Sequence, residues 1–212
     1  ARPAGFNLAD LFELVADTVA GTEAMVCGSR RLTYAALDER ANRLAHALDG
    51  LGVGAGDMVG VHLHNGTEYV ETMLASFKLR AVPVNVNYRY RQAELRYLFD
   101  DAGVTAVVTE PDLVAEVRAA LGGSGRRAAV LERGPAYESA LAGASPARDF
   151  APRSPDDRYV LYTGGTTGMP KGVLWRQEDI FFAALGGAAG GMEADSPGEV
   201  AERVRGRPSR CL

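Results

Sequence analysis

Glycine, threonine and a single lysine are concentrated in YTGGTTGMPKGV, residues 162–173, at the end of the apolar stretch RYVLY. Glycines let the backbone come close to a ligand and turn its N–H groups toward an anion. Threonine hydroxyls and the Lys171 ammonium group add donors and a positive charge, so the loop suits a chain of phosphates. A flexible hairpin between two strands is the alternative, and the lysine after Met169 and Pro170 favours phosphate binding over it.

Two other phosphate-binding loops do not fit this stretch. A Walker A loop has glycine directly before its lysine and serine or threonine directly after it, where this sequence has Pro170 and Gly172. A dinucleotide-binding loop needs G-x-G-x-x-G at the start of a helix, and no such pattern follows the first predicted strand.

The order of residues from Tyr162 to Gly172 resembles the signature loop of the adenylate-forming (AMP-binding) superfamily, usually written Y-T-S-G-T-T-G-x-P-K-G. One position differs, because Gly164 stands where the family usually has serine. Residues 32–65 and 77–108 also resemble the family, with Arg80 at a place where glycine is common. Asp156 and Asp157 match the acidic pair that precedes the signature strand.

The resemblance implies that a carboxylate is activated with ATP to an acyl-adenylate and is then transferred to coenzyme A, with Mg²⁺ as the metal ion. It implies Lys171 as the catalytic residue. No metal ligand is predicted in this sequence, and the substrates expected for the complete protein are a carboxylic acid, ATP and CoA. The resemblance places the phosphates of ATP against these residues: Thr163, Gly164, Gly165, Thr166, Thr167, Gly168 and Lys171.

Strands alternate with helices along the chain, which predicts an α/β fold with a mostly parallel sheet and flanking helices. Asn7 and Thr33 are expected to cap the first two helices, and Pro111 to lie in the first turn of a later one. The predicted helices are residues 7–21, 33–50, 67–79, 92–99 and 111–123, with a further start at DIFF. The predicted strands are residues 24–28, 30–34, 57–65, 81–87, 104–109, 158–162 and 171–175.

The resemblance covers residues 6–185, which we expect to form the N-terminal part of an AMP-binding domain with its phosphate loop at 162–172. Residues 133–157 are rich in Gly, Pro, Ala and Ser and predict an irregular crossing segment. Residues 186–212 show no periodic pattern and predict a glycine-rich, mobile tail. Later segments of the family, including those for adenine and ribose, are not found, so we expect a truncated sequence that is inactive by itself.

Three functions stay open at this point. A fatty-acyl-CoA synthetase is favoured, because GTTGMPKGVLW followed by DIFF resembles those enzymes most. Another adenylating enzyme is the first alternative, either an aryl-acid ligase or a peptide-synthetase adenylation domain. The second is a nucleotide- or acyl-binding remnant without catalysis.

Composition excludes some partners and locations. The 212 residues carry a formal net charge of −4, which argues against nucleic acid, including at the aromatic and basic run of residues 88–91. Cys27 and Cys211 are far apart, so a disulfide framework is not expected and a cytoplasmic location is. No stretch is long enough to span a bilayer, while peripheral membrane contact and a homodimer stay open. His62 and His64 lie two apart on a strand, and an exposed or capping pair is favoured over half of a metal site.

Overall fold

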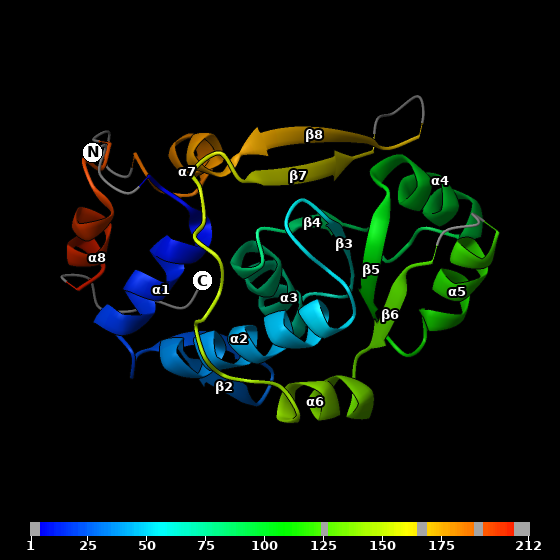
Figure 1. Ribbon diagram of the computed structural model, residues 1–212, viewed down its shortest axis with the longest axis horizontal. Helices are drawn as coiled ribbons and strands as arrows, with labels where there is room; N and C mark the ends of the chain where they lie inside the picture. The colour runs from blue at the N-terminus through cyan, green and yellow to red at the C-terminus, as the bar shows by residue number, and fades with distance from the viewer. Residues whose placement is uncertain (1–4, 124–126, 165–168, 189–192, 206–212) are drawn as a thin grey trace.

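A six-stranded sheet forms the centre of the molecule (Figure 1), for which a computed structural model describes residues 5–123, 127–164, 169–188 and 193–205. The strand order is β6-β5-β3-β4-β7-β8, and every neighbouring pair is parallel except β7 and β8. The strands are β3 (Met58–His62), β4 (Val82–Asn85), β5 (Val104–Thr109), β6 (Ala129–Glu132), β7 (Arg158–Thr163) and β8 (Lys171–Arg176). The prediction of an α/β fold with a mostly parallel sheet and flanking helices is confirmed.

Helices cover both faces of the sheet, because the central strands are apolar on both sides. One face packs against α2 (Tyr34–Gly50), α3 (Thr67–Lys78) and α6 (Pro135–Ala142). The other face packs against α4 (Gln92–Ala102) and α5 (Val114–Gly122). These two layers enclose two separate hydrophobic cores, one on each side of the sheet.

The N-terminal part of the chain lies outside the sheet. Asn7 caps helix α1 (Leu8–Thr18), and its side chain accepts hydrogen bonds from the backbone N–H groups of Ala9 and Asp10; Thr33 caps α2 in the same way. Both caps are as predicted from the sequence. Between them, β1 (Glu23–Cys27) and β2 (Arg30–Thr33) form the predicted antiparallel pair.

Three predictions about elements are wrong, and strand β6 was not predicted. Helix α5 begins at Val114, so Pro111 lies before its first turn. Residues 133–157 are not irregular throughout, because α6 lies within them and is anchored by the buried side chains of Tyr137 and Leu141. Residues 197–205, for which no regular structure is predicted, form α8 (Pro197–Arg205), and this helix packs on α1 beside α7 (Gln177–Ala184).

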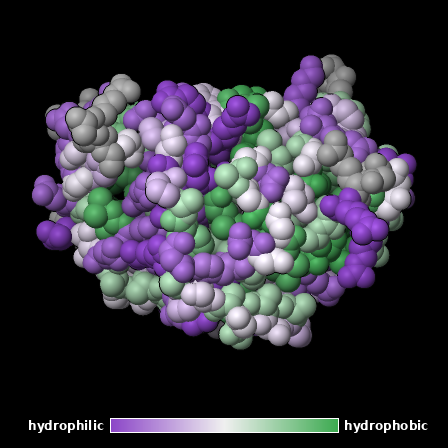
Figure 2. All heavy atoms as spheres, in the orientation of Figure 1, coloured by the Kyte–Doolittle hydropathy of each residue, from purple (hydrophilic) through white to green (hydrophobic). Residues whose placement is uncertain are grey.

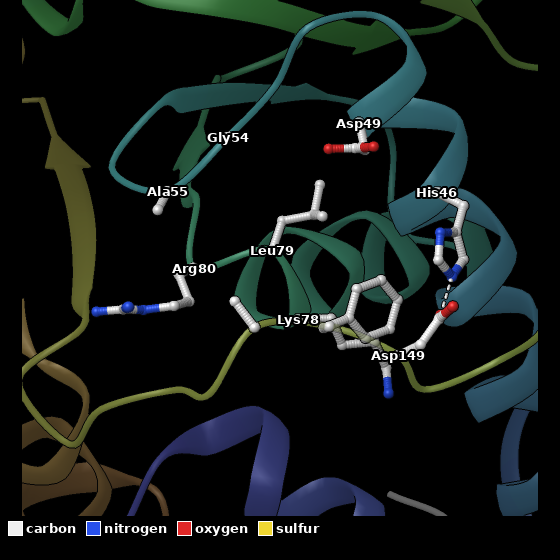
Figure 3. Close-up of a pocket in the computed structure, with 10 residues that line it drawn as sticks. His46, Asp49, Gly54, Ala55, Lys78, Leu79, Arg80 and Asp149 are labelled. Atoms are coloured by element: carbon white, nitrogen blue, oxygen red, sulfur yellow. Dashed lines mark ion pairs between the residues drawn. The ribbon is translucent and has the colours of Figure 1, made fainter.

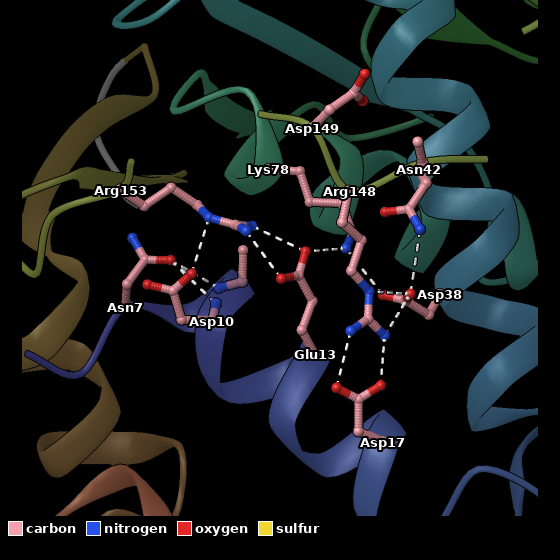
Figure 4. A network of polar contacts seen from close by, with 12 residues as sticks. Asn7, Asp10, Glu13, Asp17, Asp38, Asn42, Lys78, Arg148, Asp149 and Arg153 are labelled. Atoms are coloured by element: carbon pink, nitrogen blue, oxygen red, sulfur yellow. Dashed lines mark hydrogen bonds and ion pairs between the residues drawn. The ribbon is translucent and has the colours of Figure 1, made fainter. Parts of the chain in front are cut away.

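Residues 143–157, which we call the strap, run from α6 to the start of β7 across α1 and α2 (Figure 1). Charged side chains attach the strap to the helices below it (Figure 4). Arg148 binds Asp17 and Asp38, and Arg153 binds Asp10 and Glu13. Figure 2 shows many hydrophilic residues over this face of the molecule.

Within the described residues, no helix has both the length and the apolar character needed to cross a membrane.

Candidate phosphate-binding site

The glycine- and threonine-rich loop joins β7 to β8 in an antiparallel hairpin. The strands pair in register from Arg158 opposite Arg176 to Thr163 opposite Lys171. Residues directly opposite one another in such a pair project from the same face. The side chains of Thr163 and Lys171 therefore leave the two strands together, at the base of the loop.

The loop lies at the edge of the sheet where the parallel strands end. β7 is parallel to β4, which is parallel to β3, so the carboxyl ends of these strands share one edge. In open α/β sheets, ligands bind outside the carboxyl ends of the strands. The predicted loop is therefore at a position in the fold where nucleotide phosphates commonly bind.

The described residues of the loop suit an anionic ligand. Thr163, Gly164 and Lys171 are exposed, and within the described part of the chain no carboxylate pairs with Lys171. By contrast, Arg176 at the other end of β8 binds Asp156 and Asp179. The ammonium group of Lys171 is thus available to phosphate oxygens. Four predicted ligands lie outside the described residues, namely Gly165, Thr166, Thr167 and Gly168.

Tyr162 fixes the strand from which the loop departs. Its side chain is buried, and its hydroxyl donates a 2.7 Å hydrogen bond to Asp101 Oδ2 on α4. Burial, followed by the hydrogen bond to Asp101, raises the pKa of Tyr162, which keeps the phenol protonated as a donor. The ring also covers Gly172, where an added Cβ would lie 2.9 Å from the ring carbons. Glycine at 172 therefore allows β8 to pass close to this ring.

The start of β7 is fixed by a buried carboxylate. Asp157 accepts hydrogen bonds from Arg80 Nε at 3.0 Å and Arg80 Nη2 at 2.9 Å. Asn7 Nδ2 donates to Asp157 as well, at 3.3 Å. The acidic pair recognised in the sequence is split, since Asp157 points inward while Asp156 is exposed and binds Arg176.

Two residues that contact the signature strand were not singled out from the sequence, namely Asp101 and Asn85. Asp101 is 61 positions from Tyr162, and Asn85 is 77 positions from it. A polar residue near the end of an apolar strand, as in VPVN, is the local signal that could have indicated Asn85.

The two histidines of β3 and its following loop do not form an exposed pair. His62 is fully buried, and its Nδ1 lies 3.2 Å from the Thr109 hydroxyl. His64 is exposed and lies 3.4 Å from Glu110. Among the described residues, no group of three His, Cys, Asp or Glu side chains could hold a metal ion. We therefore assign none of the described residues to Mg²⁺.

A separate pocket of about 270 Å³ lies beneath the strap (Figure 3). Its wall includes Gly54 and Ala55 before β3 and Arg80 before β4, which places it at the amino edge of the sheet. His46 binds Asp149 at 3.0 Å across the same pocket. Because the phosphate loop lies at the opposite edge, this pocket is not part of the candidate site.

Taken together, the sheet and the hairpin define an α/β protein with a candidate phosphate loop at the carboxyl edge of a mostly parallel sheet. The model of the family described as AMP-binding enzyme matches residues 12–200, and the chain belongs to this family. The resemblance seen in the signature loop is thereby confirmed.

Known relatives show how much of such a protein is present. A 3-oxocholest-4-en-26-oate–CoA ligase of Rhodococcus rhodochrous is 46% identical over 193 residues, covering 85% of this chain and 35% of the ligase. A medium/long-chain-fatty-acid–CoA/3-oxocholest-4-en-26-oate–CoA ligase of Mycobacterium marinum is 45% identical over 197 residues, covering 85% and 36%. The chain thus spans about a third of the length of the curated relatives that it matches.

A solved structure has the same fold. The crystal structure of an anthranilate CoA ligase in complex with anthranoyl-AMP matches with a TM-score of 0.80 at 23% identity, covering 88% of this chain and 37% of that one. At this identity the likeness concerns the fold alone.

Proposed function

We propose that this chain supplies the ATP-phosphate loop of a carboxylate–CoA ligase. The observation that carries the proposal is the exposed Lys171, which has no carboxylate partner in the described chain and lies opposite Thr163 at the base of the signature loop. The β- and γ-phosphates of ATP are placed against Thr163 and Lys171, together with the loop residues 164–168.

The proposed reaction has two steps. A carboxylate oxygen of the acid attacks the α-phosphorus of ATP, and the bond from that phosphorus to the β-phosphate oxygen breaks. Negative charge grows on the departing pyrophosphate, so donors aimed at it lower the barrier. The thiol of CoA then attacks the acyl carbon, loses its proton and displaces AMP, which leaves an acyl thioester.

The acid that we propose is a hydrophobic carboxylate, either a fatty acid or the side-chain acid of a steroid. Both relatives described above carry such acids in their names, at 45–46% identity. ATP and CoA are the partner substrates of the whole protein, and residues 6–185 are proposed as the part that belongs to the AMP-binding domain. Four further points stay predictions: the use of Mg²⁺, a cytoplasmic location, peripheral membrane contact and a homodimer.

Carboxylate-dependent exchange between ATP and pyrophosphate tests the proposal. We expect none from the 212-residue chain by itself. We expect exchange with fatty and steroid acids from a chimera in which residues 12–185 replace the matching segment of the Rhodococcus rhodochrous ligase. A folded chimera without exchange would contradict the proposal and favour a binding remnant. Exchange by the chain alone would contradict the expectation that part of the active site lies outside these 212 residues.

Replacing the loop lysine tests its role in the same chimera. Lys171→Ala should lower exchange by about 100- to 1,000-fold, because one fixed donor to the leaving pyrophosphate is lost. Arg158→Ala, an exposed cation at the other end of the same hairpin, is the matched control and should keep full exchange. Equal exchange by the two variants would exclude Lys171 from the reaction.

A further inference from the structure

Strands β4 and β7 separate just before the phosphate loop. Their register is limited to one position, Val84 opposite Val160. Beyond Val84, the chain bonds to β3 on its other side, since the N–H of Val86 donates to the carbonyl of Val61 at 3.1 Å. The backbone of β4 therefore does not supply ladder partners for the last residues of β7.

The side chain of Asn85 bridges this separation. Its Nδ2 donates to the Tyr162 carbonyl at 2.9 Å, and the Tyr162 N–H donates to its Oδ1 at 2.7 Å. One carboxamide thus makes both bonds that two successive peptide groups of a neighbouring strand would make in a regular parallel ladder. An amide is the side-chain group that can donate and accept at the same time in this geometry.

Tyr162 is the first residue of the signature loop, so its position decides where Thr163 and the loop begin. The contact with Asp101 fixes the ring of Tyr162, whereas Asn85 fixes its backbone. We propose that Asn85 is a positioning residue, which holds the backbone of Tyr162 so that Thr163 and Lys171 meet the phosphates together. The proposal rests on the phosphate-binding function proposed above.

Two substitutions separate hydrogen bonding from the filling of space. Asn85→Leu keeps the size of the side chain and removes both bonds. Asn85→Asp keeps an acceptor for the Tyr162 N–H but places a carboxylate against the Tyr162 carbonyl. Asn65→Asp makes the same chemical change at an exposed residue in the loop after β3 and serves as the control.

The experiment measures two quantities on the 212-residue chain: hydrogen exchange of individual amides, and affinity for inorganic triphosphate, a probe that needs no adenine site. In Asn85→Leu, exchange at the Tyr162 amide should accelerate about tenfold, the equivalent of one net hydrogen bond, and triphosphate should bind about tenfold more weakly. Asn85→Asp should exchange at an intermediate rate. Amides of β3 and β5 should be unchanged, and Asn65→Asp should match the wild type.

Unchanged exchange at Tyr162 in Asn85→Leu would overturn the proposal. Faster exchange with unchanged triphosphate affinity would overturn it too, because the bonds would then matter only for local structure. A wild-type chain that does not bind triphosphate would overturn the proposed function itself. Triphosphate binding by the wild type thus tests the phosphate-binding function, whereas the difference between Asn85→Leu and the wild type tests the role of Asn85.

Discussion

At the residue scale, Arg80 occupies a backbone conformation that usually selects glycine. Its φ is 60°, and it is the one residue other than glycine with positive φ in the described chain. A left-handed conformation costs an ordinary residue on the order of 1 kcal/mol. Three hydrogen bonds from its guanidinium group to the buried Asp157 offset that cost. This explains why the chain tolerates arginine where the resembled family commonly has glycine.

Gly164, by contrast, has room for the serine that the family usually carries. An added Cβ would lie 3.8 Å from the Tyr90 hydroxyl, an ordinary contact, and Gly164 is not among the glycines with positive φ. We expect Gly164→Ser to leave the free energy of unfolding within about 0.5 kcal/mol of wild type. The added hydroxyl should strengthen triphosphate binding by about three- to tenfold, measured by titration calorimetry.

Gly172→Ser is the matched control in the same hairpin. Its Cβ would meet the Tyr162 ring at 2.9 Å, so we expect a destabilisation of about 1–3 kcal/mol. If the two serine variants behave alike in stability, the packing described for Tyr162 is wrong.

The buried His62 should make the stability of the protein depend on pH. Burial lowers the pKa of His62 from 6.5 to about 4. Between these values the unfolded chain binds a proton that the folded chain does not, so stability falls as pH falls from 6.5 toward 4. A shift of this size corresponds to about 3 kcal/mol.

His62→Gln should remove this part of the pH dependence, as measured by urea unfolding across that range. His64→Gln makes the same substitution at an exposed histidine two positions away and is the control. If the free energy of unfolding of His62→Gln falls with pH as steeply as that of the wild type, other groups cause the acid sensitivity.

At the element scale, local signals predicted what local chemistry determines. The caps at Asn7 and Thr33 and five of the six strands of the central sheet follow from neighbouring residues, and so does the place of the glycine- and threonine-rich loop. Strand β6 and helices α6 and α8 were missed, because their patterns are short and distant packing stabilises them. The contact of Asn85 with Tyr162 joins positions 77 apart, and no periodicity in the sequence reports such a pair.

Three helices meet at one buried cation. Lys78 of α3 is fully buried and binds Glu13 of α1 and Asp38 of α2 (Figure 4). Burial opposes ionisation of Asp38, but hydrogen bonds and charge from Lys78 and Arg148 lower its pKa overall. The cluster therefore links α1, α2 and α3 to one another and to the strap.

Lys78→Met should destabilise the protein by about 3 kcal/mol, because the buried Asp38 and the half-buried Glu13 would lose a shared partner, although their arginines remain. Arg31→Met at the more exposed pair with Glu23 is the control and should cost less than about 1 kcal/mol. Urea unfolding followed by circular dichroism measures both. Similar costs for the two variants would show that the buried cluster does not stabilise the packing of the helices.

At the scale of the whole molecule, β8 is the end strand of the described sheet and carries exposed apolar side chains. Val173 is 46% exposed and Leu174 is 55% exposed, while Met169 beside the strand is 41% exposed. A strand at the edge of a sheet also presents unpaired backbone donors and acceptors. Exposed apolar surface on such a strand favours association with another chain.

We therefore expect the 212-residue chain to self-associate through β8 as its concentration rises. Leu174→Lys should shift the population toward monomer, because a charge in the interface would have to be buried without a partner. Leu51→Lys is the matched control, since Leu51 is 46% exposed and lies beside β6, at the opposite end of the sheet from β8. Sedimentation velocity at several concentrations distinguishes the two. A wild-type chain that stays monomeric at high concentration, or equal shifts in both variants, would show that β8 is not the contact.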